Sequence, residues 1–143
     1  SISGISLNFV DKFAWIGKTT ECQPHLLLRE GSKYLCPHVY TAQDLWHSHT
    51  GVFLRVDNVT KRLLNINVDC VDENRPNGLR RVIAITTVLT DLINQPGYAL
   101  SKVTAKDVGG FLDAHMHQLH VFGKEVFGNT INDEMSKRIA LID

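Results

Sequence analysis

Four side chains that could bind a metal ion lie close together in the C-terminal third of the chain: Asp113, His115, His117 and His120. Apolar residues recur at helical spacing over 105–127, so Asp113 and His117 should lie one turn apart, as should His117 and His120. Each pair could share a metal ion, but the His-Glu-x-x-His pattern of zinc proteases is missing. We interpret these residues as surface or structural, and we keep a metal-dependent enzyme using Asp113, His117 and His120 as the alternative.

A second histidine pair is His47-Ser48-His49, with Asp57 eight residues after His49. The pattern is similar to the His-x-His…Asp ligands of JAMM-type zinc proteases. Thr50 stands where a proline usually follows the second histidine, and the spacing to the aspartate is short. Because zinc needs three or more ligands held around it, this match predicts no metal centre by itself.

Cysteine and histidine also occur together at Cys22-Gln-Pro-His25 and at Cys36-Pro-His38. A Cys2His2 zinc site at the two ends of a hairpin is conceivable, but the Cys-x-His spacing is atypical. We interpret these residues as solvent-facing and expect no metal and no cofactor. No P-loop, dinucleotide fingerprint or nucleophile elbow is present, so we expect a protein that is not an enzyme.

Length and charge limit the classes of function. A chain of 143 residues predicts one domain, and equal numbers of basic and acidic residues argue against a general nucleic-acid binder. No apolar run of 18 residues is present, so we expect no membrane insertion. An odd, scattered set of three cysteines favours reduced thiols and a cytoplasmic location.

The elements that must position these residues centre on the stretch 62–94. Alternating apolar residues predict a strand over 62–71, Pro76-Asn77-Gly78 predicts a turn, and the apolar spacing after it predicts a helix over 79–94. A strand over 51–57 should pair with 62–71 as an antiparallel hairpin under that helix.

The remaining elements complete an α+β fold, with antiparallel β-hairpins packed against a long central helix and a helical C-terminal extension. We expect a helix over 7–16, a hairpin over 25–36, and helices over 105–127 and 130–143. A short helix ending near Trp46 and a connector or short strand over 98–103 are further expectations. All belong to a single domain, with a core over 1–97 and an extension over 98–143.

The stretch 62–94 also resembles a known family. Leu63-Leu64, Ile66, Val68, Asp72-Glu73, Pro76-Asn77, Leu79-Arg80, Thr86 or Thr87, Val88 and Asp91-Leu92-Ile93 are similar to the core of IcmS/LvgA-type adaptors of the Dot/Icm type IVB secretion system. The likeness covers roughly residues 6–95. This chain is neutral where IcmS is acidic, and it continues for two predicted helices beyond the IcmS-like core.

The resemblance implies a non-enzymatic secretion chaperone at the inner-membrane secretion complex. It would bind IcmS-like and IcmW-like adaptors and the tail of a DotL-like coupling protein, and it would help to recruit effector proteins for export. Spare apolar helix surface would supply affinity, and charges at its rim would supply orientation. The candidate partner-binding residues are Arg80, Arg81, Phe111, Met116, Val121, Lys124 and Phe127.

Overall fold

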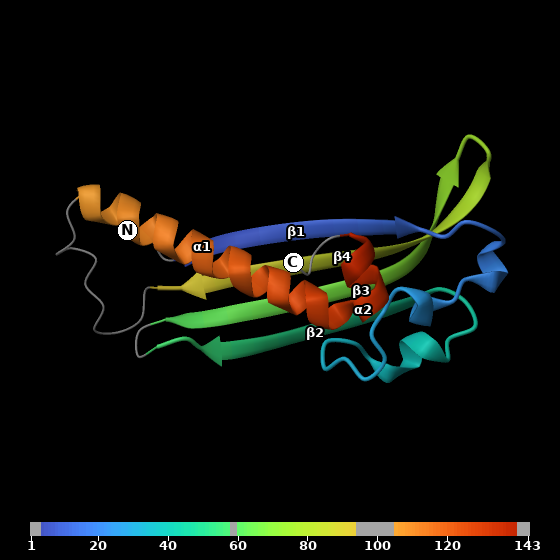
Figure 1. Ribbon diagram of the computed structural model, residues 1–143, viewed down its shortest axis with the longest axis horizontal. Coiled ribbons are helices and arrows are strands. Elements are labelled where there is room, and N and C mark those ends of the chain that lie inside the picture. Colours follow the sequence, from blue (N-terminus) through green and yellow to red (C-terminus); the bar gives the residue numbers. More distant parts are fainter. Residues whose placement is uncertain (1–3, 58–59, 94–104, 140–143) are drawn as a thin grey trace.

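A four-stranded antiparallel sheet is the main feature of the computed structural model, which describes residues 4–57, 60–93 and 105–139 (Figure 1). The strand order is β1-β4-β3-β2. The strands are β1 (Gly4–Ala14), β2 (Trp46–Arg55), β3 (Lys61–Arg75) and β4 (Gly78–Leu92). The three later strands form a meander, and β1 adds to the free edge of β4.

The β3–β4 hairpin sets the length of the sheet. Its register runs from Lys61 opposite Leu92 to Arg75 opposite Gly78. Gly78 has a φ of 111°, a conformation that side-chain-bearing residues rarely adopt, so glycine suits the end of this tight turn. Along β3, buried and partly exposed residues alternate, because successive side chains point to opposite faces of a sheet.

One face of the sheet, called the covered face below, carries the second layer of the fold. The helices α1 (Ala105–Thr130) and α2 (Asp133–Arg138) lie on it, as Figure 1 shows. Three short 3₁₀ helices, Thr19–Glu21, Pro24–Leu26 and Pro37–Tyr40, belong to the segment between β1 and β2, which packs at one end of the same layer. The core includes Leu28, Val39, Leu64, Ile66, Val68, Ile85, Leu89, Leu119, Val126 and Ile131.

A buried polar cluster lies within this second layer. Arg62 donates two hydrogen bonds to the Asp91 carboxylate, at 2.7 and 2.9 Å, and His115 Nδ1 lies 2.9 Å from Asp91 Oδ2. The Arg62 guanidinium also lies 5.2 Å from the centre of the Phe122 ring. These contacts link β3, β4 and α1, and they satisfy a carboxylate that is fully buried.

The other side of the sheet, called the open face below, carries the alternate residues of each strand. It includes Asn8 and Val10 on β1, His47 and His49 on β2, Asn65, Asn67 and Asp69 on β3, and Thr86, Val88 and Thr90 on β4. Neither α-helix packs on this face. The central residues of the open face are therefore half-buried by their neighbours in the sheet.

The expected fold of hairpins packed against a long central helix is wrong. Residues 79–94 do not form a helix: 79–92 belong to β4, the strand between β1 and β3. The stretch is rich in β-branched residues (Val82, Ile83, Ile85, Thr86, Thr87, Val88 and Thr90), which favour a strand because their side chains are restricted in a helix. The apolar spacing fits both periods, and residue type decides between them.

Three further expectations in the N-terminal half are also wrong. The predicted helix over 7–16 is largely strand β1, in which Leu7, Phe9 and Phe13 point to the covered face. The predicted hairpin over 25–36 is irregular chain with 3₁₀ turns, and strand β2 begins at Trp46, where a short helix was expected to end.

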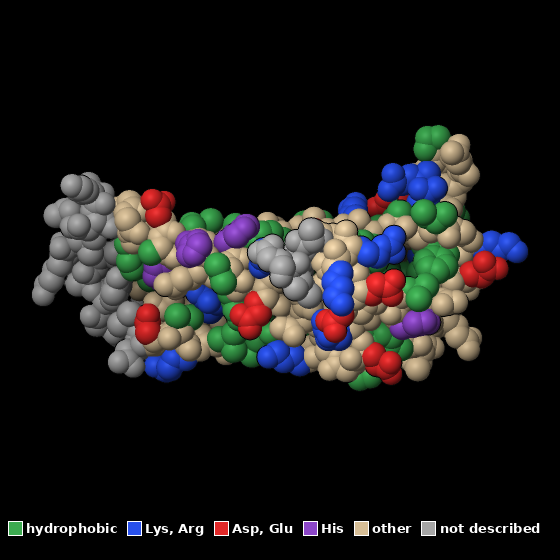
Figure 2. All heavy atoms as spheres, in the orientation of Figure 1, with side chains coloured by type: hydrophobic (Ala, Val, Ile, Leu, Met, Phe, Trp, Pro, Cys, Tyr) green, Lys and Arg blue, Asp and Glu red, His purple; other side chains and the backbone are tan. Residues whose placement is uncertain are grey.

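Other expectations are confirmed. Residues 51–55 pair with 61–65 in an antiparallel hairpin, and 105–127 lie within α1. The predicted helix over 130–143 is shorter: α2 ends at Arg138, and 140–143 are outside the described residues. The connector over 98–103 is also outside them. Figure 2 shows charged side chains of both signs scattered among hydrophobic and other residues on the side of the molecule that carries the helices.

Candidate functional site

The C-terminal histidines do not form a metal site in the described part of the chain. Asp113, His117 and His120 are all exposed on α1, and His120 packs its ring 5.8 Å from that of Phe9. Among the residues that the structure describes, one group of three places its potential ligand atoms within 4.8 Å of one another. It consists of His47, His49 and Asp69.

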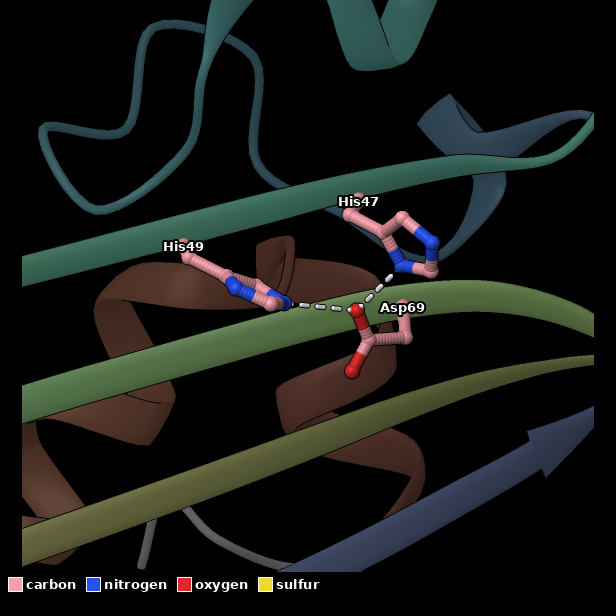
Figure 3. A group of neighbouring side chains, drawn as sticks. All are labelled: His47, His49 and Asp69. Atoms are coloured by element: carbon pink, nitrogen blue, oxygen red, sulfur yellow. Dashed lines mark hydrogen bonds and ion pairs between the residues drawn. The ribbon is translucent and has the colours of Figure 1, made fainter.

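The two histidines converge on a single carboxylate oxygen. His47 Nδ1 lies 2.6 Å from Asp69 Oδ1, and His49 Nε2 lies 2.8 Å from the same oxygen. Figure 3 shows both rings extending from β2 toward the aspartate on β3. In this arrangement each imidazole N–H donates to the carboxylate, and the three groups surround one small volume at the sheet surface.

The strand pattern explains why these residues meet. Side chains two apart on a strand point to the same face, so His47 and His49 both lie on the open face. The β2–β3 register places His47 directly opposite Asp69 and His49 opposite Asn67. Asp69 therefore faces one histidine across the strands and reaches the other on the diagonal.

The local chain also fixes the position of β2. The His38 ring nitrogen Nε2 lies 2.7 Å from the His47 carbonyl oxygen, and the Ser48 hydroxyl accepts a 2.9 Å hydrogen bond from the Cys36 N–H. Ser48 is fully buried on the covered face. The backbone between the two histidines is thus held in place by hydrogen bonds to the preceding segment, while the two imidazole rings lie on the open face.

Electrostatics favour an ionised carboxylate at the centre of the group. Partial burial raises the pKa of Asp69, but hydrogen bonds from His49 and His47 outweigh it and hold that pKa below its usual value. The side chains of His47 and His49 are 65% and 56% exposed, against 28% for Asp69. The group is accessible from solvent on its histidine side.

The residues fit a divalent transition metal. Imidazole nitrogen and carboxylate oxygen are both zinc ligands, and the donor atoms around a tetrahedral zinc ion lie about 3.3 Å apart. The two nitrogen–oxygen distances of 2.6 and 2.8 Å would each have to lengthen by about 0.5–0.7 Å to reach that separation. Two histidines and one carboxylate leave further coordination positions for water or an outside ligand.

Sequence reasoning found the His-x-His half of this group but joined it to the wrong aspartate. Asp57 lies beyond the end of β2, where its Oδ1 accepts a 2.8 Å hydrogen bond from the Thr60 N–H. Cys22, His25, Cys36 and His38 do not meet as a set of metal ligands within the described ranges. The strand register, rather than distance along the chain, selects Asp69.

The predicted partner-binding residues lie in two separate places. Arg80 is exposed near the β3–β4 turn, whereas Arg81 is buried and ion-paired with Asp72 and Asp44. On α1, Met116, Val121 and Lys124 are exposed, and Phe111 and Phe127 are half-buried. Phe127 packs against Phe13 of β1, with ring centres 6.4 Å apart. Their role in binding a partner stays a prediction.

Lys124 and Phe127 also border a cavity between β1 and α1. It has a volume of about 470 Å³, and Phe9, Asp11 and His120 are among its other lining residues. Burial raises the pKa of Asp11 above its usual value. The cavity lies on the covered face and is separate from the His47–His49–Asp69 group.

Comparison with protein-family models, with curated proteins and with solved structures finds no match to this chain. Within the described residues, no helix is both long enough and apolar enough to cross a membrane.

Proposed function

We propose that this protein binds a divalent transition-metal ion, with zinc as the first candidate, through His47, His49 and Asp69. The observation that carries the proposal is the convergence of two imidazole nitrogens on one carboxylate oxygen, with the three ligand atoms within 4.8 Å of one another. The set is of mixed nitrogen and oxygen type, which suits zinc and its neighbours better than magnesium.

The exposure of the site indicates how the ion would be used. Because both imidazoles face solvent, coordination positions that the protein leaves free point away from the sheet. Such an ion can polarise a bound water or accept a side chain from another molecule. The proposed function is metal binding with an open position at the sheet surface.

Zinc titration of the metal-free protein tests this proposal. We expect one zinc ion per chain by calorimetry in the presence of excess Mg²⁺, and at least about tenfold weaker binding in His49→Ala and Asp69→Ala, because each loses a direct ligand. The matched control is His117→Ala, which removes an exposed histidine of α1. Unchanged zinc affinity in His49→Ala, or equal loss in His117→Ala, would contradict the site.

A second candidate function, the adaptor role, is supported by the open face. Its central residues Asn65, Asn67, Thr86 and Val88 are uncharged and half-buried, and depletion of charge at the centre of a patch is typical of protein interfaces. The block in which all four strands pair is ten residues long. At about 4.8 Å per strand and 3.4 Å per residue, it offers about 650 Å², within the range of one side of a standard interface.

Under this proposal the open face binds the IcmS–IcmW–DotL-tail assembly at the inner-membrane secretion complex, and the complex recruits effectors. Co-elution of the purified protein with that reconstituted assembly tests it. We expect Thr86→Arg on the open face to abolish co-elution, while Gln43→Arg, in the exposed segment before β2, keeps it. Failure of the wild type to co-elute would contradict the adaptor role, but it would not contradict the proposed metal binding.

A further inference from the structure

Two cysteines far apart in the sequence meet on the covered face. Cys22 follows the 3₁₀ helix Thr19–Glu21, and Cys70 lies in β3. Both thiol side chains line one cavity of about 220 Å³, and they lie close enough for each thiol to affect the pKa of the other. Nothing in the sequence pattern brings them together, because 48 positions separate them and neither lies in a Cys-x-x-Cys motif.

The walls of this cavity hold the two thiols in place. Arg81 borders it and is fixed by two hydrogen bonds of 2.9 Å to the Asp72 carboxylate and by one of 3.1 Å to Asp44. Trp46, at the start of β2, lines the cavity and is only 5% exposed. The pair is thus enclosed by β2, β3, β4 and the segment after β1.

The two thiols differ in access. Cys70 is 2% exposed, whereas Cys22 is half-buried. A small molecule that enters the cavity therefore reaches Cys22 more readily than Cys70. The third cysteine, Cys36, lies elsewhere, next to Ser48.

We propose that Cys22 and Cys70 are a site of reversible disulfide modification by a small-molecule disulfide such as oxidised glutathione. Cys22 loses its proton and attacks one sulfur of the oxidant, which releases one thiol. Cys70 then attacks the Cys22 sulfur of the mixed disulfide and releases the second thiol. Two protein thiols are oxidised to one disulfide, and one small-molecule disulfide is reduced to two thiols.

The bond would tie the irregular segment between β1 and β2 to the middle of the sheet. That segment contributes Leu27, Leu28, Tyr34, Leu35 and Val39 to the core. A cross-link between positions 22 and 70 closes a long loop and so restricts the unfolded chain. Cys70 is also next to Asp69 in β3, but the two side chains point to opposite faces of the sheet.

Incubation of the reduced, metal-free chain in oxidised glutathione tests the proposal. We expect the number of free thiols to fall from three to one, and mass spectrometry of unreduced peptides to show Cys22 linked to Cys70. Dithiothreitol should restore all three thiols. Three remaining thiols, a glutathione adduct that stays on Cys22, or a disulfide that includes Cys36 would each overturn it.

Single-cysteine variants provide the matched controls. Cys36→Ser should still lose two thiols, whereas Cys22→Ser should lose none to an internal disulfide. Tryptic cleavage after Lys18, which is exposed, provides a second readout on the wild type, because the cross-link should slow opening of its segment. Equal cleavage of the oxidised and reduced wild type would show that the bond does not restrain this segment.

Discussion

Two aspartates of the same sheet each bind a histidine, yet they sit in opposite environments. Asp91 on the covered face is 0% exposed and accepts hydrogen bonds from Arg62 and His115. Asp69 is 28% exposed at its side chain and brings His47 and His49 together at solvent. The first pairing joins the sheet to α1, whereas the second joins only two adjacent strands.

The difference shows that burial, rather than residue type, decides what a histidine–carboxylate pair does. A buried carboxylate must be fully satisfied, because an unpaired buried charge is costly. An exposed carboxylate can exchange its partners for a metal ion at little cost to the fold. We therefore assign a structural role to Asp91 and a ligand-binding role to Asp69.

The variant Asp91→Ala should have the largest effect among the tests of this difference between Asp91 and Asp69. It leaves the Arg62 guanidinium buried without its carboxylate, so we expect a loss of about 3–5 kcal/mol in the free energy of unfolding. Urea denaturation followed by circular dichroism measures it. The matched variant Asp69→Ala should cost less than about 1 kcal/mol because its two histidine partners are exposed. Equal losses in the two variants would show that burial does not separate the roles of the two aspartates.

The tight packing of the covered face can be tested at Gly123. A Cβ there would lie 2.6 Å from Phe9 Cε2 and 3.2 Å from Leu89 Cδ1. We expect Gly123→Ala to destabilise the protein by about 1–3 kcal/mol through overpacking between α1 and the sheet. Gly110→Ala meets no atom within 4 Å, and thermal melting should show an unchanged or higher midpoint because alanine favours helix.

Zinc binding at the proposed site should also depend on pH. Imidazoles bind metal only when neutral, and they take up protons between about pH 8 and 5. We expect zinc affinity to fall at least about tenfold, or about 1.4 kcal/mol, from pH 7.5 to 5.5. Calorimetry at both values checks this, and constant affinity would exclude the two histidines as ligands.

The smallest effect concerns the acid stability of the metal-free site. The folded-state pKa of Asp69 is below its ordinary value, so its stabilising contribution is present above about pH 4 and is lost as pH falls through the folded value. We expect the free energy of unfolding of Asp69→Asn to fall less steeply below pH 4 than that of the wild type, by less than about 1 kcal/mol. Urea midpoints from pH 5 to 2 measure it, and an unchanged pH dependence would refute the contribution.

Parts of this structure could be predicted from the sequence, because their signals are unambiguous. The helix over 105–127 and the pairing of 51–55 with 61–65 follow from clear periodicity and are present. The strand at 78–92 was missed because both faces of this central strand carry apolar residues, which removes the alternation that identifies a strand.

The meeting of His47, His49 and Asp69 could have been predicted by one further step. Extending the predicted hairpin back along both strands places His47 opposite Asp69. The sequence does not show that β2 extends back to Trp46, because Gly51 and the polar residues before it are typical of a loop. The meeting of Cys22 with Cys70 depends on irregular chain, for which no periodic signal exists.

The pairing of β1 with β4 has a consequence for synthesis. Phe9 pairs with Thr87, 78 residues later in the chain, so β1 is synthesised well before the strand with which it pairs. At about 5–20 residues per second, β1 remains unpaired for roughly 4–16 seconds while its apolar side chains stay exposed. A nascent chain halted before β4 therefore presents a strand that a chaperone could bind.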